Sequence, residues 1–237
     1  MTDHTTSAPT SATPVPAATR RPPHPVLEQL GRDHPALFGA TVQPLKRGIF
    51  QDLMAAYGET MDKAALKTAL AIHTRSIRYL QAVASGAPRH DLQGQVVEAT
   101  APEHVLHAML ELFKRRKPRP GETPEQQQER LQRRIAQLFA DSNLTREAFL
   151  ERAQLKDPAV LASVERALDA QAEHDARAEA VARSFAASGA ASAAAFAQMY
   201  GMHPQAVQRQ LNRAAQLQAQ REAAQTEADA SAATPQA

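Results

Sequence analysis

Residues 62–80 read DKAALKTALAIHTRSIRYL, and the architecture of the first half of the chain is built around them. Asp62 is a residue type that caps helix N-termini, and apolar residues then recur at helical intervals. Those apolar residues are Leu66, Leu70, Ile77 and Leu80. The spacing predicts a single helix from Asp62 to about Val83, with these four side chains on its buried face.

A basic stripe runs along the same predicted helix. At 100° per residue it consists of Lys63, Lys67, Thr74 and Arg78, with Arg75 and Tyr79 at its border. No acidic residue occurs between Asp62 and Asp91. Cations beside a tyrosine suit phosphates together with a stacking or hydroxyl contact to a nucleotide. The alternative is a basic face that is only solvated.

Shorter elements surround this helix. Residues 25–30 predict a short helix stopped by Gly31, and residues 49–57 predict a core-facing helix ending before Gly58. Two short runs around Gln93-Gly94 predict a hairpin over residues 89–98. Pro102 then opens a helix through about Phe113 that leads into the basic run 114–119.

The second half of the chain is helical by pattern. Thr123-Pro-Glu-Gln126 matches a capping box and opens a helix through about Ala140. Asp157-Pro158 opens a longer helix towards Gly189, and two further helices follow over residues 193–200 and 204–224. We therefore expect a mainly α (α+β) protein with a compact helical domain, one short hairpin and a helical extension.

Composition excludes several classes of protein. The 237 residues contain no cysteine, which excludes disulfides, a cysteine nucleophile and a cysteine zinc site. No apolar run approaches the length of a membrane span, and no signal-peptide pattern opens the chain, so a soluble cytoplasmic protein is expected. Residues 46–119 contain twelve Lys or Arg and seven Asp or Glu, a net charge of +5, which indicates a polyanion-binding surface.

Four separate motifs carry a resemblance to a known family. They are Pro44-Leu-Lys-Arg-Gly-Ile-Phe-Gln-Asp-Leu53, Leu66-Lys-Thr-Ala-Leu70, Thr74-Arg-Ser-Ile-Arg-Tyr-Leu80 and Arg89-His-Asp-Leu-Gln-Gly94. In order and spacing they resemble the ProQ/FinO family of bacterial RNA chaperones over about residues 25–117. The resemblance implies a domain that binds structured RNA, particularly terminator-like stems with single-stranded 3′ ends, and that acts with small RNAs in post-transcriptional regulation. It also implies that the chain promotes or protects duplexes without covalent chemistry.

The resemblance and the basic pattern together nominate an RNA-binding surface. Its residues are Lys46, Asp62, Lys63, Lys67, Arg75, Arg78, Tyr79, Arg89, Lys114, Arg115, Arg116 and Lys117. In the family, the helix start at Asp62 receives the RNA 3′ end, which suits the unpaired N–H groups of a helix N-terminus. Ile77 departs from the pattern, because relatives commonly have an aromatic residue at this position.

Four regions are expected. They are a disordered leader over 1–24, an RNA-binding domain over 25–119, a helical accessory region over 120–224 and a disordered tail over 225–237. The accessory region is a candidate surface for a protein partner, and the chain is expected to be a monomer that does not bind membranes.

A DNA-binding alternative rests on residues 193–213, whose helix, glycine turn and helix outline a helix-turn-helix. Its reading residues would be Gln205, Gln208, Arg209 and Arg213. His104 and His107 have metal-pair spacing but no evident third ligand, so no metal site and no cofactor are expected. Known catalytic motifs do not occur in the sequence, and we expect the protein not to be an enzyme.

Overall fold

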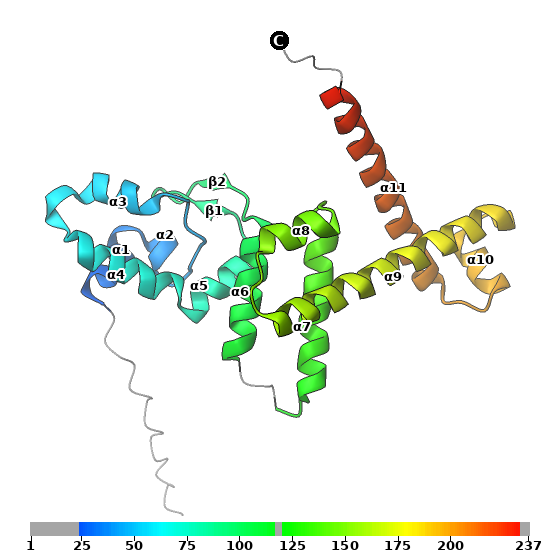
Figure 1. Ribbon diagram of the computed structural model, residues 1–237, viewed down its shortest axis with the longest axis horizontal. Helices are drawn as coiled ribbons and strands as arrows, with labels where there is room; N and C mark the ends of the chain where they lie inside the picture. Colours follow the sequence, from blue (N-terminus) through cyan, green and yellow to red (C-terminus); the bar gives the residue numbers. More distant parts are fainter. Residues whose placement is uncertain (1–23, 117–119, 233–237) are drawn as a thin grey trace, which may run out of the picture.

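The computed structural model describes residues 24–116 and 120–232, which form a helical body and an arm that projects from it (Figure 1). Helices α1 to α5 and a two-stranded hairpin make one end of the body, and α6 to α8 make the other. None of the helices in the described ranges is long and apolar enough to cross a membrane. The expected mainly helical class with one hairpin is confirmed.

The chain enters the body through four short elements. Helix α1 spans Pro25–Asp33, α2 spans Pro35–Phe38, α3 spans Ile49–Tyr57 and the 3₁₀ turn η1 spans Gly58–Thr60. The predicted stop at Gly31 is wrong, because α1 continues until the following Pro35 begins α2. The predicted end of α3 before Gly58 is confirmed: Gly58 has a φ of 54°, a conformation that favours glycine.

The predicted helix from Asp62 to Val83 is instead two helices, α4 over Lys63–Thr74 and α5 over Ile77–Ala84. Ser76 adopts an extended conformation, and its hydroxyl accepts a hydrogen bond from the Tyr79 N–H at 3.2 Å. This is an N-cap, which begins a new helix in place of continuing the old one. The break turns Ile77 outward, so this predicted core residue is 53% exposed.

The hairpin forms where the sequence predicts it. Strand β1 (Arg89–His90) pairs antiparallel with β2 (Val96–Glu98), and Gly94 in the connecting turn has a φ of 76°. His90 also bridges to the segment before α3, where its carbonyl accepts the Lys46 N–H at 2.9 Å. The hairpin therefore fixes the backbone at Lys46.

Three helices complete the body, of which α6 packs against α5 while α7 and α8 pack against α6. Helix α6 spans Pro102–Arg115, α7 spans Pro124–Asp141 and α8 spans Arg146–Ala153, a short helix that the sequence pattern did not predict. The predicted capping box at Thr123 and Gln126 is present, with both hydrogen bonds. One hydrophobic core runs from Leu30 in α1 to Leu168 in α9. Its side chains continue without interruption across the expected boundary at Arg119, which stays a prediction.

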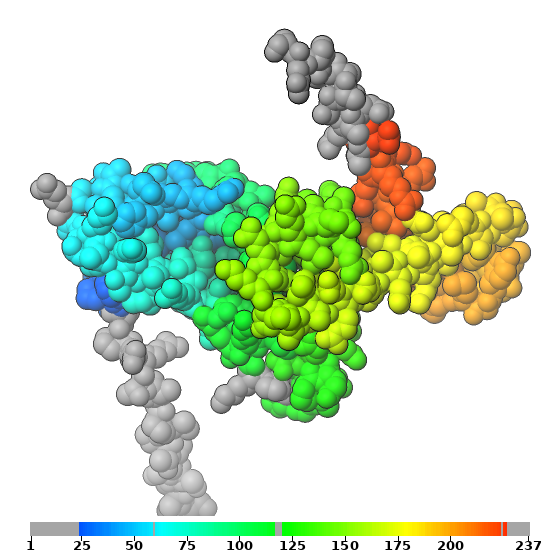
Figure 2. All heavy atoms as spheres, viewed as in Figure 1, coloured from blue at the N-terminus to red at the C-terminus, as the bar shows by residue number. Residues whose placement is uncertain are grey.

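The arm consists of α9 over Pro158–Ser188, α10 over Ala193–Met199 and α11 over Pro204–Ala232. Phe196 and Val207 form a second, smaller core with α9 residues such as Phe185. Figure 2 shows the outer part of α9 and α10 extending beyond the body. Helix α11 runs past the predicted end near Ala224. Residues 1–23 and 233–237, which include most of the predicted disordered leader and part of the predicted tail, lie outside the described residues.

Candidate nucleic-acid interface

The start of α4 presents two lysines on one face. Asp62 caps the helix, and its Oδ2 accepts the Ala65 N–H at 2.6 Å. Lys63 and Lys67 follow one turn apart, and both are exposed. Neither lysine forms an ion pair within residues 24–116 and 120–232, so both ammonium groups are available to an anion. Their predicted placement on one helix face is confirmed.

The helix break separates the rest of the predicted stripe from these lysines. Thr74 ends α4, and its hydroxyl donates to the Leu70 carbonyl at 2.8 Å. Arg75 is exposed at the junction of α4 and α5. Arg78 lies on α5, where its guanidinium donates to the Gly39 carbonyl at 3.1 Å and to the Ala40 carbonyl. Because the stripe bends at Ser76, it is not one straight face as predicted.

Tyr79 is buried, so its ring is not available for the stacking that the sequence suggested. The residue is 8% exposed, and its ring packs edge-on against His73 with the ring centres 5.3 Å apart. Its hydroxyl accepts the Leu45 N–H at 3.2 Å. Tyr79 therefore positions the backbone beside Lys46, and only its hydroxyl remains a candidate for an RNA contact.

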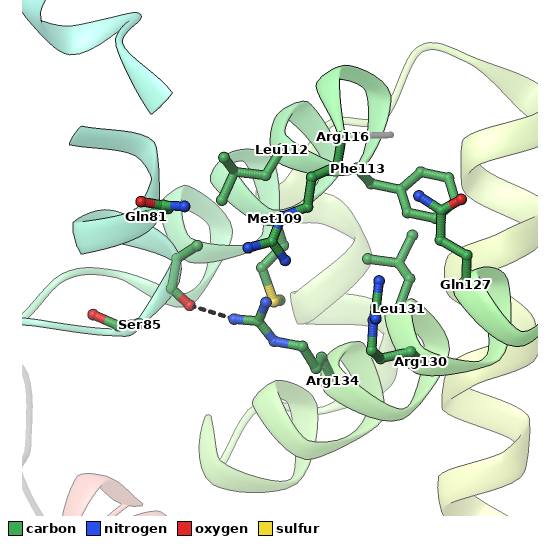
Figure 3. A pocket seen from close by; sticks show the side chains of 11 residues that line it. Gln81, Ser85, Met109, Leu112, Phe113, Arg116, Gln127, Arg130, Leu131 and Arg134 are labelled. Carbon is green, nitrogen blue, oxygen red and sulfur yellow. Dashed lines mark hydrogen bonds between the residues drawn. The ribbon is translucent and has the colours of Figure 1, made fainter. Parts of the chain in front are cut away.

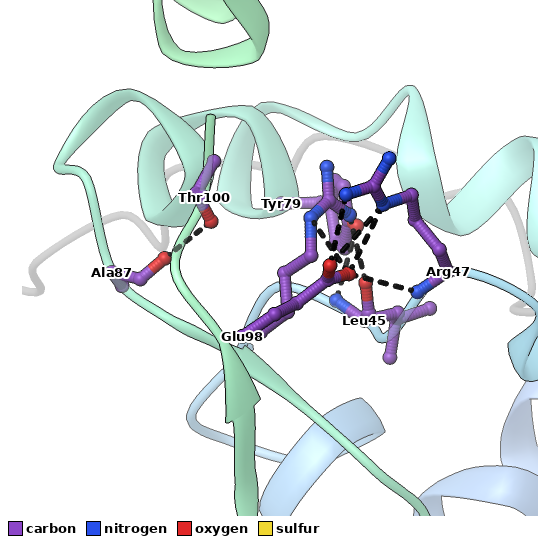
Figure 4. A network of polar contacts seen from close by, with 7 residues as sticks. Leu45, Arg47, Tyr79, Ala87, Glu98 and Thr100 are labelled. Carbon is purple, nitrogen blue, oxygen red and sulfur yellow. Dashed lines mark hydrogen bonds and ion pairs between the residues drawn. The ribbon is translucent and has the colours of Figure 1, made fainter. Parts of the chain in front are cut away.

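Two arginines converge on the same backbone segment and share one carboxylate (Figure 4). The Arg89 guanidinium donates to the Leu45 carbonyl at 2.8 Å and lies 3.6 Å from Glu98. Arg47 pairs with Glu98 at 3.0 Å. The hydrogen bond from Arg47 lowers the pKa of Glu98, so this carboxylate stays ionised. Two guanidinium groups against one carboxylate leave this cluster with a net positive charge.

Lys46 lies beside this cluster and is partly neutralised. Its Nζ lies 2.8 Å from Asp52 Oδ2, and this hydrogen bond raises the pKa of Lys46. Lys46 is therefore charged, but an RNA phosphate would compete with Asp52 for it. We call residues Lys46, Arg47, Tyr79, Arg89 and Glu98 the Leu45 cluster. Arg47 was missed as a site residue, although it directly follows Lys46 in a quoted motif.

The end of α6 adds a second basic group at the junction of α4 and α5. Arg115 pairs with Glu111 at 2.7 Å and donates to the Arg75 carbonyl. Lys114 and Arg116 are exposed and have no carboxylate partner in the described part of the chain. Lys117, the last of the predicted RNA-binding residues, lies outside the described residues. The structure thus brings Arg75 and Arg115 together, although they lie 40 positions apart in the sequence.

The DNA-reading residues of the alternative are partly committed to other contacts. Arg213 donates to both carboxylate oxygens of Asp175 on α9, at 2.7 and 2.9 Å, and its side chain is 14% exposed. Burial pushes the pKa of Asp175 upward, but the hydrogen bonds from Arg213 and Gln171 lower it overall. Gln208 donates to Asn212 at 2.8 Å. The Arg213–Asp175 pair fastens α11 onto α9, and the Gln208 bond lies within α11, so these contacts do not support the DNA-binding alternative.

The predicted histidine pair is not part of a larger ligand set in the structure. Residues 24–116 and 120–232 contain no cluster of three or more His, Cys, Asp or Glu that could hold a metal ion. Burial and the nearby Arg89 lower the pKa of His104, while His107 is exposed.

Comparisons with known proteins agree with the sequence resemblance. Residues 20–128 match the family described as ProQ/FINO. A curated RNA chaperone ProQ from Pseudoalteromonas atlantica is 41% identical over 91 residues, which cover 37% of this chain and 42% of the relative. The chain thus spans less than half the length of that relative.

Two solved structures are also similar to part of this chain. One is a FinO-like RNA chaperone from Neisseria meningitidis with 32% identity, for which 35% of this chain and 86% of that chain are covered with a TM-score of 0.33. The other is a ProQ homologue from Legionella pneumophila with 28% identity, for which 46% and 98% are covered with a TM-score of 0.34.

Proposed function

We propose that this chain, whose residues 20–128 match the ProQ/FINO family, is an RNA chaperone that binds structured RNA in the cytoplasm. The observation that carries the proposal is that the family match includes the exposed lysines of α4 and the Leu45 cluster. Cations on a helical surface bind phosphates without reading base sequence, which suits ligands recognised by shape.

We propose further that the ligands are hairpins with single-stranded 3′ ends, such as small RNAs and mRNA 3′ ends. The first N–H groups of α4, beside Asp62, would receive the 3′ end, and Lys63 and Lys67 would contact the neighbouring phosphates. The Leu45 cluster, Arg75, Arg78 and residues 114–117 would contact the stem. The protein would promote duplexing or protect RNA without covalent chemistry, acting as a monomer with its C-terminal helices free for a protein partner.

A gel-shift experiment with the full chain tests the class of ligand. The probes are a hairpin RNA with a single-stranded 3′ tail, the same hairpin without the tail, and a DNA duplex of the stem sequence. Tightest binding to the tailed hairpin is expected. Equal or tighter binding to the DNA duplex would contradict the proposal and favour the DNA-binding alternative.

Substitution of Lys67 tests the proposed face. Lys67→Ala should weaken binding of the tailed hairpin severalfold and reduce the slope of log affinity against log salt by about one, because one phosphate contact is lost. The melting temperature should not change, since Lys67 is exposed and forms no ion pair in the described ranges. Lys156→Ala is the matched control, because Lys156 is an exposed lysine in the loop before α9. Equal losses in the two variants would argue against this face.

A further inference from the structure

A cavity lined by arginines lies between α5, α6 and α7, and it shares only Arg116 with the interface described above. Its volume is about 110 Å³, enough for several water molecules. Arg116 reaches it from the end of α6, and Arg130 and Arg134 reach it from successive turns of α7 (Figure 3). Arg130 and Arg134 lie beyond the residues that match the family.

Two of the three guanidinium groups in this cavity have no counter-charge. Arg130 pairs with Glu122 at 2.7 Å. Arg134 donates to the Ala84 carbonyl at 2.9 Å, a bond that holds its guanidinium at the end of α5 but does not neutralise it. Neither Arg134 nor Arg116 has a carboxylate partner in the described residues. The cavity therefore carries an excess of positive charge.

The floor of the cavity strengthens the effect of this charge. Met109, Leu112 and Leu131 line it, and Figure 3 shows the side chains of Arg116 and Arg134 beside Met109. An apolar floor keeps water away from one side of the guanidinium groups, so both their mutual repulsion and their attraction for an anion increase. An anion with several oxygens relieves the repulsion between the guanidinium groups of Arg116 and Arg134 and accepts hydrogen bonds from both of them.

The cavity adjoins the candidate interface. Arg115, the residue before Arg116, donates to the Arg75 carbonyl at the junction of α4 and α5. Gln81 on α5 and Ser85, which follows the last residue of that helix, also line the cavity. Arg115 at the candidate interface and Arg116 at the cavity are adjacent residues, so one polyanion can contact both places.

We propose that this cavity binds a backbone phosphate of the same RNA, so that the RNA contacts α7 as well as the family domain. The inference rests on the proposed function and extends it to residues of the helical extension. The phosphodiester enters between Arg116 and Arg134, and Arg130 becomes a third donor when its pair with Glu122 opens.

Substitution of Arg134 in the full chain tests the proposal. Arg134→Gln should weaken binding of a hairpin RNA by roughly fivefold to tenfold and reduce the salt slope by about one. Arg133→Gln is the matched control, because Arg133 directly precedes Arg134 on α7, does not line the cavity and has a 76% exposed side chain. The control should change affinity by less than twofold. Arg134→Lys keeps the positive charge but loses the planar guanidinium group with its paired N–H donors. Its salt slope should match that of the wild type, and its affinity should lie between those of Arg134→Gln and the wild type.

Arg116→Gln is the second variant, because Arg134→Gln also removes the hydrogen bond to Ala84 and melting curves could reveal a loss of stability. If both arginines bind one phosphate, the double variant should lose less affinity than the product of the two single losses. Independent, multiplicative losses would overturn the shared phosphate.

Three outcomes separate the proposals. A chain that binds no hairpin RNA overturns the proposed function itself. If the wild type binds hairpin RNA but Arg133→Gln loses as much affinity as Arg134→Gln, only the proposed phosphate site in the cavity is overturned. If millimolar inorganic phosphate raises the melting temperature of the wild type but not of Arg134→Gln, while RNA affinity is unchanged, the cavity binds free phosphate and the RNA contact is overturned.

Discussion

The hydroxyl of Tyr79 is the acceptor for a backbone N–H that has no other partner among the described residues. Leu45 is 3% exposed, so water cannot replace this bond. Tyr79→Phe should therefore lower the free energy of unfolding by about 1–3 kcal/mol, the cost of a buried unpaired donor. Urea denaturation at pH 7 measures it. An unchanged free energy of unfolding would show that the hydrogen bond contributes nothing to stability.

Truncation of the same residue is a poor test of RNA contact. Tyr79→Ala would remove a buried ring that packs against His73, and a cavity of that kind costs about 3–5 kcal/mol. Lost binding in that variant would report unfolding as much as a missing contact. Tyr79→Phe keeps the ring and changes only the hydroxyl, so it separates the two effects.

His73 makes the fold sensitive to acid. Its ring lies between Phe38 and Tyr79 and is 7% exposed, and burial lowers the pKa of His73 to about 4, with Arg78 adding to the effect. Between pH 6.5 and 4 the unfolded chain takes up a proton that the folded chain does not. The free energy of unfolding should therefore decrease as the pH is lowered from 6.5 to 4, and His73 should contribute up to about 3 kcal/mol to this decrease.

Urea denaturation at pH 7, 6 and 5 measures the contribution of His73. His73→Leu should show a shallower decline than the wild type, because the titrating group is gone. Parallel pH profiles for the two proteins would assign the acid sensitivity to other groups.

At the scale of elements, the break between α4 and α5 depends on the cap at Ser76. Ser76→Ala leaves the Tyr79 N–H without its side-chain acceptor and should cost about 1 kcal/mol. Ser184→Ala is the control, because Ser184 is exposed in the C-terminal part of α9 and caps no helix, and alanine suits a helix. Thermal denaturation followed by circular dichroism compares them. An equal change in the two variants would contradict a special role for the cap.

Elements with strong local signals were predictable from the sequence. The hairpin, the capping box at Thr123 and the helix ending before Gly58 depend on residues within a few positions of each other. The break at Ser76 was not predicted, because a serine inside an apolar helical pattern can either continue a helix or cap a new one. That choice is made by tertiary packing.

The same break decided what could be predicted of the site. Lys63 and Lys67 precede it, and their shared face was predicted correctly. Arg78 and Tyr79 follow it, so a projection along one straight helix assigned Tyr79 to the surface when it is buried. The pairing of Arg75 with Arg115 depends on the packing of α6 near the α4–α5 junction, which sequence spacing does not contain.

At the scale of the whole molecule, the continuous core predicts where the chain can be cut. Leu131, Ile135 and Phe149 belong to the same core as the residues that match the ProQ/FINO family. A fragment of residues 20–119 lacks α7 and α8, so the face of α6 that they cover becomes exposed. A fragment of residues 20–170 contains both helices and keeps that face covered. The shorter fragment should melt several degrees lower than the longer one.

Differential scanning calorimetry of the two fragments and the full chain measures this difference. The melting temperature of the longer fragment should be close to that of the body in the full chain, because this fragment keeps every residue of the main core. Equal melting temperatures for the two fragments would show that α7 and α8 add no stability and would support the boundary expected at Arg119.

The 31-residue length of α9 has a hydrodynamic consequence. At 1.5 Å per residue the helix is about 46 Å long, and its outer part carries α10 beyond the body (Figure 2). A compact chain of this length has a radius of gyration of about 18 Å. Residues held far from the centre of mass, as α10 is at the outer end of α9, increase rotational friction more than their number alone would. The molecule therefore tumbles as an elongated particle, more slowly than a sphere of 25.7 kDa.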